Sequence, residues 1–236
     1  MTQNLYVDGT EWSLGDSTWP VQLLKQFDNY HNSAEPYKSS EGILQSYYSY
    51  IRSLGQTDEP DTEYAIKNSV YVIEFPDPYN QTLWIPEYGT HVNVCGSTFN
   101  SWTADEELRN NPTDHFLELV EKQKAKLQAW TELRGTTEVY NEQAKAINSI
   151  ISHCRVFGAA TRIIIKDGNH MPDGDALRSV FHPYMVTKTH HYLATPKFVL
   201  KEDDDFNGDT VTDSGHRRYG IYVAKTLTRD NIIAQR

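Results

Sequence analysis

The order in which helix-like and strand-like segments follow one another most constrains the fold of this chain. Apolar residues recur at helical spacing in two early segments, one after Thr18-Trp19-Pro20 and one from Glu41 to a stop at Gly55. Three short alternating segments with turn sequences between them come next, which predicts a β-meander. These predicted strands are Val70–Phe75, Thr82–Ile85 and His91–Cys95.

Two helices are predicted in the centre of the chain. Asp114–Leu133 has the clearest apolar stripe, Gly135 ends it, and a second helix starts at Thr136, so that the pair forms an αα-hairpin. Four later segments rich in β-branched and aromatic residues are predicted strands: Val156–Ile165, Tyr184–Thr195, Phe198–Lys201 and Tyr219–Leu227.

Helices and strands in this order do not alternate regularly. The pattern therefore predicts the α+β class, with a mainly antiparallel sheet, N-terminal helices and a central αα-hairpin. A chain of 236 residues fits one domain spanning 1–236, and a division into two parts would fall near residues 97–112.

Charge is distributed unevenly along the chain. Residues 1–110 contain sixteen acidic and five basic residues, whereas residues 111–236 contain sixteen and seventeen, and the formal net charge is −10. This acidity argues against general nucleic-acid binding, which needs a basic surface. Acidic, aromatic surfaces suit protein contacts, so we predict an interface between unlike faces of neighbouring subunits. Its predicted residues are Tyr47, Tyr48 and Tyr50 on one face and Arg217 and Arg218 on the other.

Sequence motifs for common nucleophilic and nucleotide-dependent enzymes are missing. The chain has no G-x-S-x-G, no Walker A sequence and no G-x-G-x-x-G. The leading hypothesis is therefore a non-enzymatic assembly protein that forms homo-oligomers, such as a capsid-associated, connector or tail component of a virion. An acidic inhibitor that mimics nucleic acid is a further alternative.

The rival hypothesis is a metal-dependent enzyme. Six of the nine histidines lie between residues 153 and 216, together with many aspartates, and these side chains suit a transition metal. The candidate ligands are His170, Asp173, His190 and His216. Their spacing matches no standard metal motif, since His170-x-x-Asp173 is one residue longer than a His-x-Asp step.

An acidic segment near the C-terminus resembles half of a calcium loop. Residues 203–208 fit the pattern D-x-D-x-N-G, which predicts Ca²⁺ ligands at Asp203, Asp205, Asn207 and Asp209. Position twelve is Ser214 where a glutamate is expected, so an acidic turn without an ion is the competing interpretation. No other cofactor is predicted.

The ends and the cysteines bear on localisation. The N-terminal residues lack the basic and apolar regions of a signal peptide, and no apolar stretch is long enough to span a bilayer. We expect synthesis in the cytoplasm, no membrane contact, and a place in the virion if the viral hypothesis holds. Cys95 and Cys154 are expected to be buried thiols.

Overall fold

A five-stranded parallel sheet forms the centre of the protein. The computed structural model describes residues 3–10, 12–15, 17–55, 62–96, 101–134, 136–165, 192–193, 199–200, 202–207 and 210–233. The sheet has the order β2-β1-β3-β7-β8, and every one of its described pairings is parallel. Its strands are β1 (Asn4–Asp8), β2 (Asn29–Asn32), β3 (Ser69–Phe75), β7 (Ala160–Ile165) and β8 (Tyr192–Leu193).

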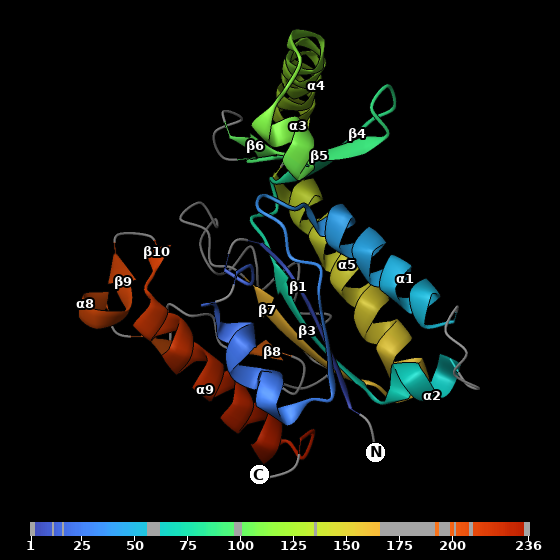
Figure 1. Ribbon diagram of the computed structural model, residues 1–236. Coiled ribbons are helices and arrows are strands. Elements are labelled where there is room, and N and C mark those ends of the chain that lie inside the picture. The colour runs from blue at the N-terminus through green and yellow to red at the C-terminus, as the bar shows by residue number, and fades with distance from the viewer. Residues whose placement is uncertain are drawn as a thin grey trace.

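Helices cover both faces of this sheet, which makes a three-layer α/β arrangement (Figure 1). On one face lie α1 (Ser40–Leu54), α2 (Thr62–Lys67) and α5 (Thr136–Phe157). On the other lie the 3₁₀ helix η1 (Trp19–Gln26) and α9 (Asp213–Arg229). Strands buried on both faces must be apolar along their whole length, and all seven residues of β3 are buried.

A small subdomain is inserted after β3, above the carboxyl edge of the sheet (Figure 1). It contains a three-stranded antiparallel sheet in the order β4-β5-β6 and has its own apolar core, built around Ile85, Val92 and Phe116. Its elements are β4 (Gln81–Ile85), β5 (Thr90–Val94), β6 (Trp102–Thr103), α3 (Glu106–Asn110) and α4 (Asp114–Leu133).

A short segment precedes the last helix. It consists of α8 (Glu202–Asp205) and an antiparallel pair formed by β9 (Phe206–Asn207) and β10 (Thr210–Val211). Thr212 caps α9, because its side-chain oxygen accepts a hydrogen bond from the Gly215 backbone N–H at 3.1 Å. Among the described residues, no helix combines the length and the apolar character needed to cross a membrane.

The predicted α+β class with a mainly antiparallel sheet is wrong. The central sheet is parallel. The prediction failed because it did not recognise β1 as a strand, and β1 pairs in parallel with both β2 and β3. The predicted meander is also wrong: β4 and β5 form an antiparallel hairpin, but β3 belongs to the other sheet. The two central helices exist, yet they pack on different cores, α4 on the inserted sheet and α5 on the central sheet.

Two predicted strands near the C-terminus are not strands. Tyr219–Leu227 lies within α9, where buried residues recur at helical spacing on the side that faces the sheet. Val199 has a helical conformation and Leu200 lies in a bend, so neither belongs to a strand. Phe198 and Lys201 lie outside the described residues. Most of Tyr184–Thr195 also lies outside them, and only β8 is seen there.

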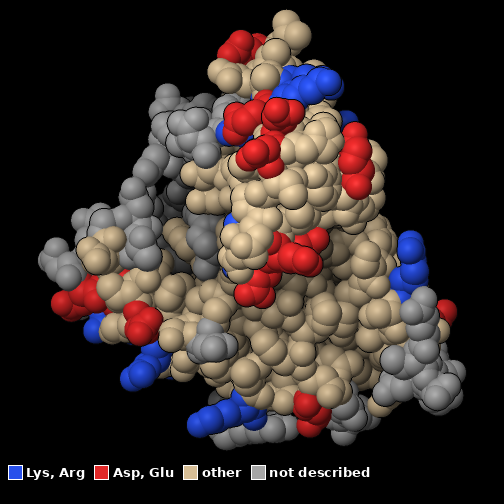
Figure 2. Space-filling model, turned by 45° about the horizontal axis from the view of Figure 1, so that its top comes forward, with Lys and Arg blue, Asp and Glu red and all other residues tan. Residues whose placement is uncertain are grey.

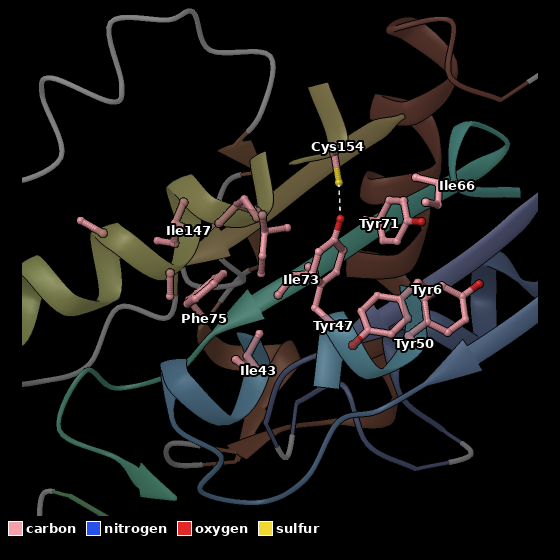
Figure 3. Packing of buried hydrophobic residues seen from close by; sticks show 14 of the residues in the cluster. Tyr6, Ile43, Tyr47, Tyr50, Ile66, Tyr71, Ile73, Phe75, Ile147 and Cys154 are labelled. Atoms are coloured by element: carbon pink, nitrogen blue, oxygen red, sulfur yellow. Dashed lines mark hydrogen bonds between the residues drawn. The ribbon is translucent and has the colours of Figure 1, made fainter. Parts of the chain in front are cut away.

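Tyrosines fill much of the core beneath α1 and α5. Tyr6, Tyr47 and Tyr71 are fully buried, and their rings meet at tilted or edge-on angles with centroid separations of 5.4 to 6.2 Å (Figure 3). The Tyr47 hydroxyl also lies 3.2 Å from the Cys154 sulfur, so the thiol belongs to this core.

Close packing of α9 on η1 depends on one glycine. A Cβ at Gly220 would lie 2.6 Å from the Gln22 Cβ and 2.8 Å from the Trp19 carbonyl oxygen. We expect Gly220→Ala to lower the free energy of unfolding by about 1–3 kcal/mol, because the two helices must separate. Chemical denaturation measures this loss. Gly55→Ala is the control, since Gly55 has an ordinary right-handed backbone conformation, and an equal loss in both variants would contradict the close-packing argument.

Candidate functional site

The site lies at the carboxyl edge of the parallel sheet, where the chain leaves β1 on one side and β3 on the other. Ligands of doubly wound sheets bind at such a change of direction, because loops on opposite faces leave a crevice between them. Here the edge is formed by the ends of β1 and β3, by the loops after β1 and β2, and by the start of α9.

A buried ion pair lies at the end of β1. Asp8 is fully buried, and its carboxylate accepts hydrogen bonds from the Lys38 ammonium at 2.9 Å and the Tyr6 hydroxyl at 2.8 Å. The Gly9 backbone N–H donates a third bond at 2.8 Å. Burial raises the pKa of Asp8 to about 6, and the Lys38 charge is the main opposing influence. The pair joins β1 to the loop before α1, where Lys38 also donates to the Ser33 carbonyl.

A second buried carboxylate lies at the end of β3. Glu74 accepts hydrogen bonds from the hydroxyls of Thr10 at 2.5 Å and Ser13 at 2.7 Å. A Cβ at Gly9 would lie 2.7 Å from the Cβ of Glu74, so the first position after β1 has no room for a side chain. The loop after β1 is therefore held against β3 by its own hydroxyls.

The start of α9 supplies an imidazole and a carboxylate. His216 is half-buried and lies three residues after the exposed Asp213, in the first turn of the helix. Burial lowers the pKa of His216, and the Asp213 charge opposes this shift. His216 is thus held neutral near neutral pH, which is the form that can accept a proton.

The packing of α9 against η1 relates this pair to the loop after β1. Both helices run away from the carboxyl edge, side by side on one face of the sheet (Figure 1). Gly220 of α9 lies against Trp19 and Gln22 of η1. His216 precedes Gly220 by one helical turn, and Ser17 precedes Trp19 by two residues, so both lie toward the starts of these two packed helices. Ser17 is exposed.

The predicted calcium ligands are only partly described. Asp205 is buried and forms an ion pair with Arg218 at 3.0 Å, while Asn207 is exposed in β9. The side chain of Asp203 and all of Asp209 lie outside the described residues. The calcium loop is therefore untested and stays a prediction, although Asp205 already has a cationic partner.

The predicted transition-metal ligands are not brought together in the described part of the chain. His170, Asp173 and His190 lie outside the described residues, and His216 is the one predicted ligand that can be placed. Within the described residues, no group of three or more His, Cys, Asp or Glu side chains could hold a metal ion.

The predicted interface residues lie on different parts of the fold. Tyr47 is fully buried and Tyr50 nearly so, and both serve the core, whereas Tyr48 is partly exposed. Arg217 and Arg218 are exposed in the first turns of α9 rather than at a strand end. Association of the chain with other subunits stays a prediction.

Sequence reasoning named His216 but missed Asp213, whose charge acts on that imidazole. One available signal was Thr212-Asp213, a capping residue followed by an acidic first turn, which indicates a helix start and places Asp213 and His216 on one turn. That the helix after Ser17 packs on α9 is a contact between segments far apart in the sequence, and no local pattern contains it.

Comparison with known proteins shows the fold. The sequence matches no family profile and no curated protein. The structure is similar to the psychrotrophic esterase EstA from Pseudoalteromonas sp., with a TM-score of 0.53, 11% identity, and coverage of 98% of this chain and 99% of that protein. It is also similar to a carbohydrate esterase described as having divergent catalytic and non-catalytic binding functions (TM-score 0.50, 11% identity, 96% and 65% covered).

A third solved structure is a putative lipolytic protein of the G-D-S-L family from Desulfitobacterium hafniense DCB-2 (TM-score 0.49, 9% identity, 96% and 100% covered). The fold, an α/β arrangement with a parallel central sheet, is similar to that of the esterase EstA. This finding overturns the prediction of a non-enzymatic virion component, because the fold shared with an esterase extends over nearly the whole chain.

Removing the cation at the site tests the buried ion pair. We expect Lys38→Met to lower the free energy of unfolding by about 3–5 kcal/mol near pH 8, since it leaves the Asp8 carboxylate buried without its charged partner. The folded pKa of Asp8 is already above its ordinary value, and losing Lys38 raises it further. Protonation therefore relieves the cost, and the loss shrinks as the pH falls toward 5.

Chemical denaturation at several pH values measures this dependence. Lys67→Met, at an exposed position that ends α2, is the matched control. A Lys38→Met loss that equals the control, or that grows toward acidic pH, would contradict the ion-pair assignment.

Proposed function

We propose that this protein is a serine-dependent hydrolase of carboxylic esters, with Ser17 as nucleophile, His216 as general base and Asp213 as the carboxylate that supports the imidazole. The observation that carries the proposal is the packing of α9 on η1, two helices that both run away from the carboxyl edge of the sheet: the exposed Ser17 lies two residues before η1, and His216 lies in the first turn of α9. A nucleophile, a base and an orienting acid are the elements of acyl transfer.

The reaction follows from the proton positions. The Ser17 oxygen attacks the ester carbonyl carbon while His216 accepts the hydroxyl proton, and the imidazolium then gives that proton to the departing alkoxide. Water attacks the acyl-serine in a second step, with His216 again taking and returning a proton. The Asp213 charge stabilises the imidazolium in both steps, which agrees with its opposing effect on the pKa of His216.

The esterase fold of the comparison proteins supports this assignment. EstA is described as an esterase and was solved in a form inhibited by monoethylphosphonate. Phosphonates react with activated nucleophiles, so a reagent of the same class offers a direct probe of Ser17.

Non-catalytic binding of an ester ligand is the second candidate function. It is favoured by the first position after β1, where Gly9 has no side chain and no room for one. The next two hydroxyls, of Thr10 and Ser13, are held by Glu74.

Substitution of the proposed nucleophile and base tests the hydrolase proposal. We expect the wild-type protein to hydrolyse p-nitrophenyl acetate and to be labelled on Ser17 by a fluorescent ethyl phosphonate, as mapped by peptide mass spectrometry. Ser17→Ala and His216→Ala are each expected to lower kcat by at least about 10³-fold, because each removes one member of the acyl-transfer set.

Matched controls are available on surfaces away from the site. Ser149→Ala on α5 and His115→Ala on α4 should each leave both turnover and labelling intact. Absence of both turnover and label in the wild-type protein would reject hydrolysis and leave the binding function. A label on Ser13 or Thr10 would reject Ser17 as nucleophile.

The pH dependence of turnover tests the role of Asp213 separately. Because burial lowers the pKa of His216, we expect kcat/KM to fall on the acid side with a midpoint below the ordinary histidine value of 6.5. Asp213→Asn removes the charge that opposes this shift, so the midpoint should move to still lower pH. A midpoint that is unchanged or higher in Asp213→Asn would show that the carboxylate does not act on the base.

A further inference from the structure

A polar groove lies between α1 and the β4–β5 hairpin of the inserted subdomain. Its cavity volume is about 400 Å³, and a second cavity of about 480 Å³ continues it, with Glu35 and His91 shared between the two. The second cavity reaches Leu14, in the loop that also carries Ser17. Together they form an extended groove that leads to the carboxyl edge, of a size suited to a small-molecule ligand.

One wall of the groove is a hydroxyl-rich face of α1. Ser46, Ser49 and Ser53 recur at helical spacing on the side that lines the groove, and each is at least partly exposed. At Gly42, a Cβ would lie 2.5 Å from the Thr82 hydroxyl, so the absence of a side chain lets α1 approach β4 closely. Hydroxyl groups both donate and accept hydrogen bonds, which matches a ligand that itself carries hydroxyls.

The charged groups of the first cavity have partners, whereas the second cavity is also lined by Asp105, which accepts a hydrogen bond from the Thr90 hydroxyl, and by the exposed Glu106 and Arg109. Lys38 is bound to Asp8 at 2.9 Å, and the Glu35 carboxylate accepts a hydrogen bond from the Asn93 amide at 2.8 Å. Figure 2 shows charged side chains in small separate groups, with a wide uncharged surface between them, on the face that it presents. The first cavity, beside α1, is therefore suited to a neutral polar ligand, and the carboxylates of the second can accept hydrogen bonds from hydroxyl groups.

Flat ring surfaces complete the lining. The exposed His31 ring lines the groove and stacks on the nearly buried Tyr50, with centroids 4.8 Å apart. On the opposite wall, His91 packs against the half-exposed Trp84 at 4.7 Å. Sugar rings carry faces of C–H groups that pack on such surfaces, while their hydroxyls bond to serine and amide groups at the edges.

We propose that this groove binds a neutral oligosaccharide and directs it toward the carboxyl edge. The volumes of the two joined cavities leave room for more than one sugar unit, and the hydroxyl-rich wall, the paired charges of the first cavity and the exposed histidine rings fit uncharged sugars. Binding itself does not depend on catalysis. That the bound sugar carries the ester which Ser17 cleaves rests on the proposed function.

Blocking the groove tests the proposal. Isothermal titration calorimetry would measure binding of xylotetraose, cellotetraose and chitotetraose to the wild-type protein and to Ser17→Ala. We expect both proteins to bind at least one of the three with similar affinity. Ser49→Trp places an indole in the groove from an exposed position, so we expect its affinity to fall at least tenfold while its thermal unfolding stays close to wild type.

Glu41→Trp is the matched control, because it puts the same side chain on an exposed position of α1 that does not line the groove. Its affinity should equal that of the wild type. Lack of binding to all three sugars, or equal binding by Ser49→Trp, would overturn the proposal. Tighter binding of tetragalacturonate than of any neutral sugar would overturn the assignment of a neutral ligand. None of these outcomes depends on turnover of p-nitrophenyl acetate, so the two proposals fail separately.

Discussion

Two buried carboxylates at the ends of neighbouring strands constrain the rest of the structure. Asp8 and Glu74 are each almost completely shielded from water, and a buried carboxylate is costly unless it is paired and hydrogen-bonded. The cost of burying Asp8 is offset by the Lys38 cation, and that of burying Glu74 by hydrogen bonds from two hydroxyls of the loop after β1. Two loops must therefore close over the sheet edge in defined positions, and the crevice between them follows from that requirement.

The loop after β1 also determines which hydroxyl groups are available for chemistry at the carboxyl edge of the sheet. Since Thr10 and Ser13 are held by Glu74, their hydroxyls are used for structure, and the loop can offer a reactive hydroxyl only farther along, where Ser17 is exposed. The loop then enters η1 directly, so the position of Ser17 is tied to a helix that packs on α9. The proposed nucleophile and base thus lie at the starts of two packed helices that are about 200 residues apart in the sequence.

Local signals in the sequence predicted several elements and failed where contacts between distant segments decide. The helices at Asp114–Leu133 and from Thr136 were predicted correctly, since capping residues and apolar periodicity are local. The parallel sheet was missed because β1 has only five residues and its two partners lie at Asn29–Asn32 and Ser69–Phe75. In α9, Tyr219, Tyr222 and Val223 favour strands by propensity, yet packing against the sheet overrides that preference. The site needed both corrections, because only a parallel sheet has one edge where β1, β3 and the start of α9 meet.

The inserted subdomain can line the groove because it begins where the chain leaves the central sheet after β3. It follows β3, whose last residues include Glu74, so its hairpin emerges at the same edge as the proposed nucleophile. Thr82 of that hairpin accepts the Ser39 backbone N–H, and Asn93 donates to Glu35, which fixes the hairpin to the loop before α1. That loop also carries Lys38, the partner of Asp8. The buried ion pair, the groove and the carboxyl edge are thus joined through one short segment, residues 35–39. An insertion at another strand end would have its own core but no wall to contribute to the site.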